Sequence, residues 1–351
     1  APMTDPTQTL LAPEELTPAV DLVTRALEQL DRVLLGRPEL HRMVLIGVLA
    51  KGHLLLEGLP GVGKTAMIKA LGDVFSLDFG RVQFTPDLMP ADILGMHLLE
   101  ETNGTHDWTF KAGPVFTNIL LADEINRASP KTQSALLEAM QERSVTLMGA
   151  TRELPYPFFV LASQNPIELE GTYPLPEAQL DRFLFKLNIA AASVEVMDEI
   201  ISSRRRGDPP AVTWSMSADE LGSLFAVMDR IFLPRPVSRY ISRLVAATHI
   251  DSPEAPTSVR DYVSYGASPR AAIAIAEAAR ASALLQGRPT VGFADVRRVA
   301  SAVLNHRVLL NYKAKFDRID STGVIDDLLS ALDETGMALP DDLKVDTKED
   351  A

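Results

Sequence analysis

Residues 58–65 read Gly-Leu-Pro-Gly-Val-Gly-Lys-Thr and match the pattern G-x-x-x-x-G-K-[ST]. The short apolar run at 53–57 before them is typical of a buried strand, and residues 66–71 after them have a helical pattern. Glycines let backbone N–H groups surround phosphate oxygens, and the helix N-terminus adds positive potential. Lys64 would reach the β- and γ-phosphates, and the Thr65 hydroxyl would ligate Mg²⁺. The stretch therefore predicts a nucleotide site in a strand–loop–helix unit, in preference to a plain glycine-rich turn.

Three further apolar runs, at 81–84, 118–122 and 158–163, have the length of buried strands in a parallel sheet. Helical patterns separate these runs along the chain. Alternation of strand and helix predicts an α/β fold, a P-loop αβα sandwich around a parallel sheet.

A pair of carboxylates, Asp123 and Glu124, follows the 118–122 run directly. An apolar strand that ends in two carboxylates is the Walker B arrangement. Asp123 would hold Mg²⁺ through its water shell, and Glu124 would polarise the attacking water as general base. A solvated Asp-Glu pair at a strand end is common in isolation, but the phosphate loop earlier in the chain favours the functional interpretation.

The rest of the chain is predicted to be helical. Helical spacing runs from Pro18 to Leu35 and from Leu40 to Ala50, ahead of the first strand. Strand-like runs stop after about Ile189, and the helices expected beyond it cover 193–207, 217–232, 235–249, 268–286 and 293–309. In the fourth, Ser268 suits the N-cap, Pro269 the first turn and Gly287 the end.

These patterns predict two domains. We expect a flexible lead-in at 1–15, a nucleotide-binding domain at 16–190, an all-helical lid domain at 191–335 and an acidic flexible tail at 336–351. Within the first domain, 93–110 reads as a hairpin around Asn103-Gly104, and 143–161 reads as a second hairpin around Gly149.

Composition excludes several classes of protein. The 351 residues include no cysteine, which rules out disulfides, thiol nucleophiles, iron–sulfur clusters and cysteine zinc sites and fits a cytoplasmic location. No apolar run approaches the roughly 18 residues of a membrane helix, and residues 1–5 do not resemble a secretion signal. The six histidines show no metal-ligand spacing.

The net charge of −13 sits mostly at the two ends of the chain. Residues 317–351 carry −8 and residues 1–30 carry −4, so the central 31–316 is close to neutral. The predicted 97–108 hairpin holds three carboxylates and no Lys or Arg, which would repel a phosphate backbone. We therefore do not expect nucleic acid as a partner, because of the charge of this hairpin more than because of the total charge.

From about Leu30 to Leu310 the chain resembles AAA+ ATPases, and within them the MoxR family. The residues that carry this resemblance, besides the phosphate loop and 52–58, are 83–87 (QFTPD), 123–128 (DEINRA), 133–141 (QSALLEAMQ), 163–166 (SQNP), 176–183 (PEAQLDRF) and 266–271 (GASPRA). Many unrelated proteins contain a phosphate loop, whereas this ordered set is far more specific.

The resemblance implies several roles. Asn165 looks like the first sensor, which orients the lytic water, although a turn-forming Asn before Pro166 is a local alternative. Arg182 resembles the arginine finger for a neighbouring subunit's γ-phosphate, with an ion pair to Asp181 or Glu177 as the alternative. Arg270 resembles the second sensor in the lid, and a surface arginine is its alternative.

Arg270 also has a physical argument, because a guanidinium in the first turn of a helix is unfavourable unless an anion faces it. Arg127 follows Walker B, and either a contact in trans or a structural ion pair fits it. By resemblance, apolar side chains and backbone at Leu35 and Gly36 lie near the adenine. The residues expected to bind the nucleotide are Leu35, Gly36, Gly58, Pro60, Gly61, Val62, Gly63, Lys64, Thr65, Ala66 and Asp123.

The predicted activity is Mg²⁺-dependent hydrolysis of ATP. The residues expected to carry it are Lys64, Glu124, Asn165, Arg182 and Arg270, with Thr65 and Asp123 at the metal. The resemblance implies a ring, most often a hexamer, that remodels or matures a client protein or inserts its metal cofactor, with a von Willebrand factor A domain protein as partner. Two alternatives stay open: a DNA-directed, helicase-like motor, and a P-loop kinase or GTPase-like switch. The switch gives no reason for Asn165, Arg182 and Arg270.

Overall fold

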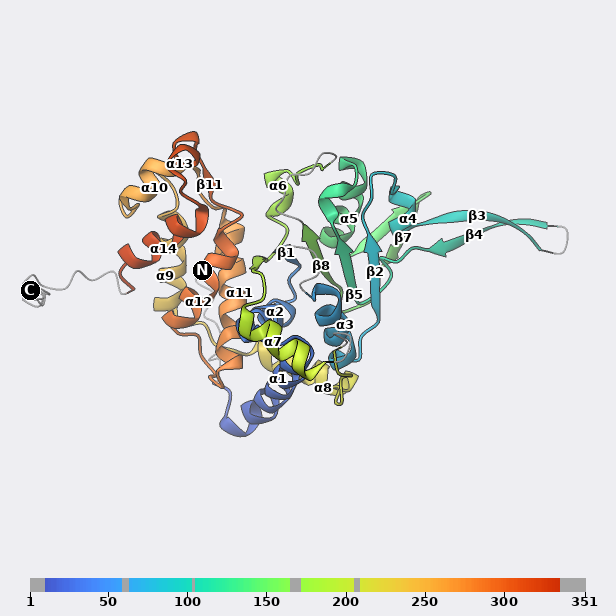
Figure 1. Cartoon of the computed structure of the whole chain (residues 1–351), viewed down its shortest axis with the longest axis horizontal. Helices are drawn as coiled ribbons and strands as arrows, with labels where there is room; N and C mark the ends of the chain where they lie inside the picture. Colours follow the sequence, from blue (N-terminus) through green and yellow to red (C-terminus); the bar gives the residue numbers. More distant parts are fainter. Residues whose placement is uncertain (1–9, 59–62, 103–104, 165–171, 205–208, 335–351) are drawn as a thin grey trace, which may run out of the picture. The chain divides into compact units, whose positions relative to one another are not determined.

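The structure is a computed structural model that describes residues 10–58, 63–102, 105–164, 172–204 and 209–334. Contacts divide the chain into two compact units (Figure 1). Unit 1 comprises Ala1–Phe232 and Glu277–Val291, and unit 2 comprises Leu233–Ala276 and Gly292–Ala351. Among the described residues, no helix combines the length and apolar character needed to cross a bilayer.

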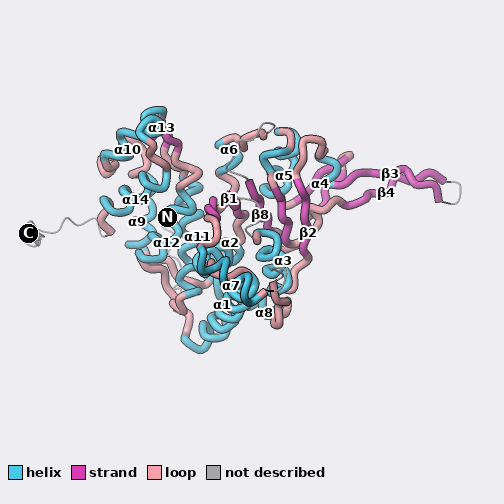
Figure 2. Tube along the Cα trace, in the orientation of Figure 1, coloured by secondary structure: helices cyan, strands magenta, loops and turns pink. Residues whose placement is uncertain are grey.

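Unit 1 is built on a parallel sheet, drawn as magenta strands in Figure 2. Its strands are β1 (Leu54–Gly58), β2 (Phe79–Gln83), β5 (Ile119–Asp123), β8 (Phe159–Gln164) and β9 (Phe185–Ile189), in the order β2-β5-β8-β1-β9. The register pairs Gln83 with Asp123 and Glu57 with Gln164, so the carboxyl ends of four strands form one row. The predicted α/β class is confirmed.

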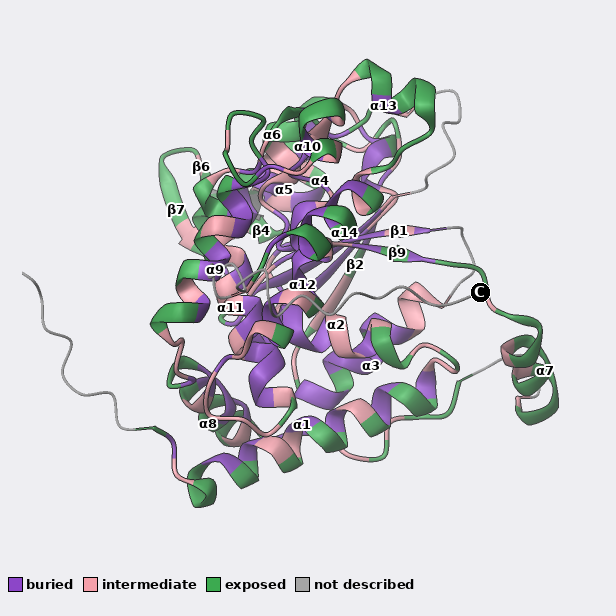
Figure 3. Ribbon diagram, turned by 90° about the vertical axis from the view of Figure 1, so that its left-hand side faces the viewer, coloured by how far each residue is buried: buried purple, intermediate pink, exposed green. Residues whose placement is uncertain are grey.

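Helices cover both faces of this sheet, and the strands between them are mostly buried (Figure 3). On one face, Leu136 and Leu137 of α5 (Pro130–Glu142) join a buried cluster with Leu55 and Leu120 of the strands. α4 (Pro90–Leu94) contributes to the same cluster through Ile93. Burial on both faces explains why the three central strands, β5, β8 and β1, are apolar runs without alternation, whereas the outer strands β2 and β9 contain exposed polar residues.

The opposite face of the sheet is covered by α2 (Pro38–Leu49) and α3 (Lys64–Phe75). Gly47 of α2 lies against Leu54 of β1, and Gly72 of α3 lies close to Ile119 of β5. α1 (Pro13–Val33) packs in turn on α3. Two short helices, η1 (Ile125–Arg127) and α6 (Glu177–Leu180), complete the segment up to β9.

The first helix begins earlier than the sequence predicts. α1 starts at Pro13, and Pro18 lies inside it, where we expected the helix to begin. Pro13 occupies the first turn, and the carboxylate of Glu15 accepts a hydrogen bond from the N–H of Ala12 at 3.0 Å. This local cap starts the helix before Pro18, so the flexible lead-in cannot extend to residue 15.

Residues 191–232 group with unit 1 by contacts, although the sequence places them in the lid. They include α7 (Val194–Ser203) and α8 (Ala218–Asp229). The N–H of Met216 donates to the carbonyl of Val74 at 2.7 Å, and the Ser76 hydroxyl donates to the Met216 carbonyl at 2.7 Å. This connection ties the segment before α8 to the C-terminal end of α3, a contact that no local pattern announces.

Unit 2 is mainly helical, as predicted. Its helices are α9 (Arg235–Ala246), α10 (Thr257–Tyr262), α12 (Phe293–Leu304), α13 (Tyr312–Asp317) and α14 (Ser321–Ala331), and α11 (Pro269–Leu285) spans the boundary between the units. Gly287 has a φ of +67° just after α11, which confirms it as the stop signal. The buried Oγ of Ser268 has no hydrogen-bond partner within the described residues, so the expected side-chain N-cap is not formed.

The expectation that strands end at Ile189 is wrong. β10 (Val263–Tyr265) and β11 (Leu309–Leu310) form a small antiparallel pair in unit 2. Runs of two or three residues are too short to show a period of two, so only the pairing of distant segments reveals them.

Both predicted hairpins form in unit 1. β3 (Gly95–Thr102) pairs with β4 (Thr105–Ala112), and Thr102 opposite Thr105 leaves the two-residue connection that Asn-Gly predicts. β6 (Ser144–Leu147) pairs with β7 (Ala150–Glu153), so this hairpin ends before residue 154. The expected bounds of 143–161 are too long, because residues 159–161 belong to β8 of the central sheet. The guanidinium of Arg152 lies 3.9 Å from the ring centroid of Phe110, so the two hairpins contact each other near their bases.

Candidate nucleotide site

A pocket of about 470 Å³ lies at the carboxyl ends of β1, β5 and β8, in unit 1. The residues that line it are Gly58, Gly63, Lys64, Thr65, Ala66, Arg81, Gln83, Asp123, Glu124, Ser163 and Gln164. A larger pocket of about 580 Å³ lies between α3 and residues 209–215. Of the residues in the phosphate-loop motif and the first turn of α3, only Ala66 lines this larger pocket. The smaller pocket therefore joins the loop residues to both carboxylates and is the candidate site.

Glycine is required at each of the two described glycine positions of the loop, and the structural reason differs between them. Gly63 has a φ of +85°, the left-handed conformation that glycine adopts without strain, just before α3 begins. At Gly58, a Cβ atom would lie 2.6 Å from the carbonyl oxygen of Ile189 on β9. Gly58 is thus required by the close approach of a neighbouring strand. Pro60, Gly61 and Val62 lie outside the described residues.

Lys64 begins α3, and its Nζ donates to the carbonyl oxygen of Gly58 at 2.8 Å. Burial lowers the pKa of Lys64 below its usual value, while the carboxylates of Asp123, Glu124 and Glu57 act in the opposite direction. The ammonium is held at the mouth of its own loop, where a phosphate could replace the carbonyl as its partner.

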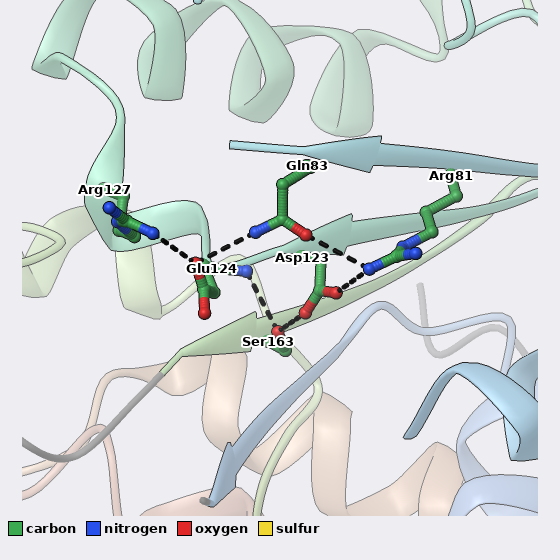
Figure 4. Close-up of polar contacts among 6 residues, drawn as sticks. All are labelled: Arg81, Gln83, Asp123, Glu124, Arg127 and Ser163. Carbon is green, nitrogen blue, oxygen red and sulfur yellow. Dashed lines mark hydrogen bonds and ion pairs between the residues drawn. The ribbon is translucent and has the colours of Figure 1, made fainter. Parts of the chain in front are cut away.

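Ser163, at the end of β8, connects the two carboxylate residues. Its hydroxyl donates to Oδ1 of Asp123 at 2.5 Å, and its oxygen accepts the backbone N–H of Glu124 at 3.0 Å. Figure 4 shows this bridge between the ends of two neighbouring strands. The bridge fixes the Asp123 carboxylate and the backbone of Glu124 relative to β8.

Glu124 adopts a left-handed backbone conformation, with φ 56° and ψ 48°. Such a conformation is unfavourable for a non-glycine residue and persists where its surroundings enforce it. Its Oε2 accepts hydrogen bonds from Gln83 at 2.9 Å and from Arg127 at 3.0 Å (Figure 4). For Arg127, the structure shows the ion pair within the chain that was one of its two expected roles.

Two residues of β2 that line the pocket, Arg81 and Gln83, were not among the site residues predicted from the sequence. Arg81 donates to Oδ2 of Asp123 at 2.8 Å and to Oε1 of Gln83 at 3.1 Å. Their spacing of two residues puts both side chains on one face of β2. That spacing is the only local signal, because the contact depends on the pairing of β2 with β5.

The remaining expected site residues do not line this pocket. Arg182 is half-buried and lies just after α6. Arg270 is exposed in the first turn of α11, within unit 2. Asn165 follows β8 and lies outside the described residues.

For the adenine, Leu35 is half-buried and Gly36 is exposed with a φ of +70°. A Cβ on Gly36 would clash with Val196 of α7, at 2.1 Å, and a Cβ on Gly63 would lie 2.5 Å from Leu34. The segment around residue 34 therefore lies beside the last glycine of the phosphate loop, but Leu35 and Gly36 do not line the pocket itself.

His53, just before β1, is buried and makes hydrogen bonds within the fold. Its Nδ1 accepts the N–H of Val160 at 3.0 Å, which leaves the proton on Nε2 to face the carbonyl of Met140 at 3.2 Å. Burial lowers the pKa of His53 to about 4. Within the described parts of the chain, no group of three or more His, Cys, Asp or Glu residues could hold a metal ion.

Comparison with known proteins assigns the family. Residues 53–185 match the model of the ATPase family associated with various cellular activities, and residues 255–328 match an AAA lid domain. The chain is 44% identical to the chaperone MoxR1 of Mycobacterium tuberculosis over 319 residues, covering 91% of this chain and 84% of that protein. It is 43% identical to the uncharacterised protein YeaC of Bacillus subtilis, covering 91% and 96%.

A crystal structure from Cytophaga hutchinsonii, described as a candidate ATPase, superposes with a TM-score of 0.82 at 36% identity. The superposition covers 91% of this chain and 97% of the Cytophaga hutchinsonii chain. The protein MoxR of Methylorubrum extorquens is 30% identical over 337 residues, covering 91% and 96%. These similarities extend over the nucleotide-binding fold and the lid together. The chain therefore belongs to the MoxR family of AAA+ ATPases.

Proposed function

We propose that this chain hydrolyses ATP with Mg²⁺ in the pocket described above, and that a ring of such subunits uses the energy to remodel or mature a client protein. The observation that carries the proposal is the convergence of Lys64, Asp123 and Glu124 on one pocket at the end of a parallel sheet. A loop that binds phosphates, a metal-holding carboxylate and a general base are the parts that phosphoryl transfer to water needs.

The donor set suits Mg²⁺. The Thr65 hydroxyl and the Asp123 carboxylate are both oxygen ligands that line the pocket, and Mg²⁺ prefers oxygen ligands with several retained waters. When bound, the ion would neutralise charge on the phosphate oxygens. Thr65 and Asp123 would hold it, and Ser163 keeps the Asp123 carboxylate oriented.

Glu124 would take the proton from the attacking water. Its left-handed backbone and its hydrogen bonds to Gln83 and Arg127 hold the carboxylate at the edge of the pocket. Lys64 would exchange its present partner, the carbonyl of Gly58, for a phosphate oxygen. Asn165, the residue after β8, would orient the water by analogy with the family.

The ring proposal is supported by Arg182. Its half-buried side chain does not line the pocket of its own chain, which leaves it available to a neighbouring subunit's nucleotide. Family resemblance favours a hexamer and gives Arg270 the second-sensor role. The relative named chaperone MoxR1 supports a chaperone-like output. Client maturation, metal-cofactor insertion and a von Willebrand factor A domain partner extend that proposal, as does a cytoplasmic location.

The test measures phosphate release by the full chain with ATP and Mg²⁺, with no acceptor other than water. Glu124→Gln should reduce turnover by at least about 10²-fold and leave binding of a fluorescent ATP analogue intact. Lys64→Ala should weaken binding itself. Undiminished turnover in Glu124→Gln would show that Glu124 is not the general base, and absence of nucleotide binding in the wild type would overturn the proposal.

A further inference from the structure

Five hydrogen bonds close a ring around the two carboxylate residues, and Figure 4 shows all of them. Arg81 donates to Asp123, Ser163 donates to Asp123, and the N–H of Glu124 donates to Ser163. Gln83 then donates to Glu124, and Arg81 donates to Gln83. A single guanidinium nitrogen, Nη2 of Arg81, therefore contacts both Asp123 and the residue that holds Glu124.

The contact between Arg81 and Asp123 differs from an ordinary surface ion pair. The Asp123 side chain is only 17% exposed, whereas that of Arg81 is 47% exposed. In the register, Arg81 lies opposite Leu121 and Gln83 lies opposite Asp123, so the arginine reaches forward along β5 to the strand end. Its guanidinium arrives in the same pocket as Thr65 and Lys64.

We propose that Arg81 is a positioning residue that competes with Mg²⁺ for the Asp123 carboxylate and so sets the Mg²⁺ concentration at which the site accepts nucleotide. This inference rests on the proposed ATPase function. One carboxylate oxygen of Asp123 is already committed to Ser163, and the other is the oxygen that Arg81 contacts. A divalent ion at Asp123 would use that second oxygen.

The physical reason is like-charge repulsion. A guanidinium and a divalent cation on one partly buried carboxylate repel each other more strongly than they would in water. Binding of Mg²⁺ must therefore displace Arg81 from Asp123, or else Mg²⁺ binds with lower affinity while Arg81 stays in place. Arg81 is exposed enough to swing away from Asp123, and its departure also removes the donor to Oε1 of Gln83.

The alternative role for Arg81 is a direct ligand of the phosphates, since it lines the pocket. The two roles predict opposite results. A competitor of the metal weakens Mg²⁺-dependent binding and leaves metal-free nucleotide binding nearly unchanged. A phosphate ligand strengthens nucleotide binding whether or not the metal is present.

The test uses the full chain and a slowly hydrolysed fluorescent ATP analogue, so that the readout is affinity and not turnover. Affinity is measured in EDTA and then across a Mg²⁺ titration, for wild type, Arg81→Gln and Arg127→Gln. Arg127→Gln is the matched control, because it removes one positive charge near the site but contacts Glu124 and not Asp123. Circular dichroism checks that each variant is folded.

We expect Arg81→Gln to lower the Mg²⁺ concentration for half-maximal binding by about three- to tenfold, the range for the net contribution of one hydrogen bond, because Arg81 is partly exposed. Arg127→Gln should change it less than about twofold. Arg81→Lys keeps the positive charge but loses the two parallel N–H donors of the guanidinium. Its Mg²⁺ concentration for half-maximal binding should therefore lie between those of wild type and Arg81→Gln. In an Asp123→Asn background the Arg81→Gln effect should disappear.

An unchanged half-maximal concentration in Arg81→Gln overturns the inference, and so does an equal shift in Arg127→Gln. Weaker binding of Arg81→Gln in both EDTA and Mg²⁺ would show that Arg81 is a phosphate ligand instead. Each of these results leaves the proposed function standing. Failure of the wild type to bind nucleotide at any Mg²⁺ concentration would overturn the proposed function as well.

Discussion

The hydroxyl of Ser163 donates a hydrogen bond to Oδ1 of Asp123 at 2.5 Å, across neighbouring strands of the sheet. Ser163 is almost completely buried, so water cannot replace the hydroxyl when it is removed. Ser163→Ala should lower kcat by about tenfold and stability by about 1 kcal/mol, and it should change nucleotide affinity in EDTA less than twofold. Steady-state kinetics measures kcat, binding of a fluorescent ATP analogue measures affinity, and urea unfolding measures stability. An unchanged kcat would show that the bridge does not orient Asp123 for catalysis.

Stability should fall in mild acid because of His53. Burial lowers its pKa from 6.5 to about 4, so the unfolded chain takes up a proton that the folded chain refuses. The contribution of neutral His53 is complete above pH 6.5 and declines as the pH falls toward 4. Its full size is on the order of 3 kcal/mol. Between pH 7 and pH 5, the free energy of unfolding measured in urea should fall less for His53→Gln than for wild type. Equal decreases would contradict the lowered pKa of His53.

Two glycines should respond to alanine in opposite directions. Gly58→Ala places a Cβ 2.6 Å from the carbonyl oxygen of Ile189, so it should destabilise unit 1 by about 1–3 kcal/mol. Gly222 lies exposed in α8 with nothing within 4 Å of its Cβ position, so Gly222→Ala should stabilise by about 1 kcal/mol. Chemical denaturation of both variants gives the comparison. If Gly58→Ala were neutral, the close approach of β9 could not be the reason for glycine there.

Arg182→Ala should keep nucleotide binding and lose turnover by about 10³-fold if the arginine serves a neighbouring site. Mixing this variant with Glu124→Gln subunits should restore activity, because one subunit supplies Glu124 and the other supplies Arg182. Each variant assayed alone is the control. If mixing restores nothing while Arg182→Ala also unfolds at lower temperature, Arg182 is a structural residue.

DNA binding should be weak. The β3–β4 hairpin contains Glu100, Glu101 and Asp107, and residues 97–108 include no Lys or Arg. Filter binding at low salt, with and without nucleotide, should therefore detect no tight complex. Tight binding that weakens steeply with salt would revive the alternative of a DNA-directed motor.

The parts of the site that could be predicted are those formed by residues adjacent in the sequence. Lys64 and Thr65 follow a strand and open a helix, and Asp123 and Glu124 end another strand, so sequence alone could assign them. The ring through Arg81, by contrast, exists because β2, β5 and β8 pair in a particular register. Register between strands far apart in sequence is not visible in a local pattern, which is why Arg81 was missed.

The same distinction applies to the fold. Helices such as α9 and α12 were predicted because their apolar residues recur over several turns. The two-residue β11 was not, and the grouping of α8 with unit 1 depends on contacts such as Met216 to Val74. The spacing of apolar residues placed the start of the first helix near Pro18, whereas the cap between Ala12 and Glu15 starts the helix at Pro13.

Strand β2 stands at one end of the sheet order, and eleven residues, which include α4, separate its last residue Gln83 from the start of the β3–β4 hairpin at Gly95. The N–H of Phe84, the residue after this strand, donates to the carbonyl of Asp123 at 2.8 Å. The chain between the hairpin and the site therefore runs through α4, whose Ile93 is buried in the core, and then through the strand that carries Arg81 and Gln83. A partner bound to this hairpin would thus be a short stretch of chain away from the side chains that contact Asp123 and Glu124.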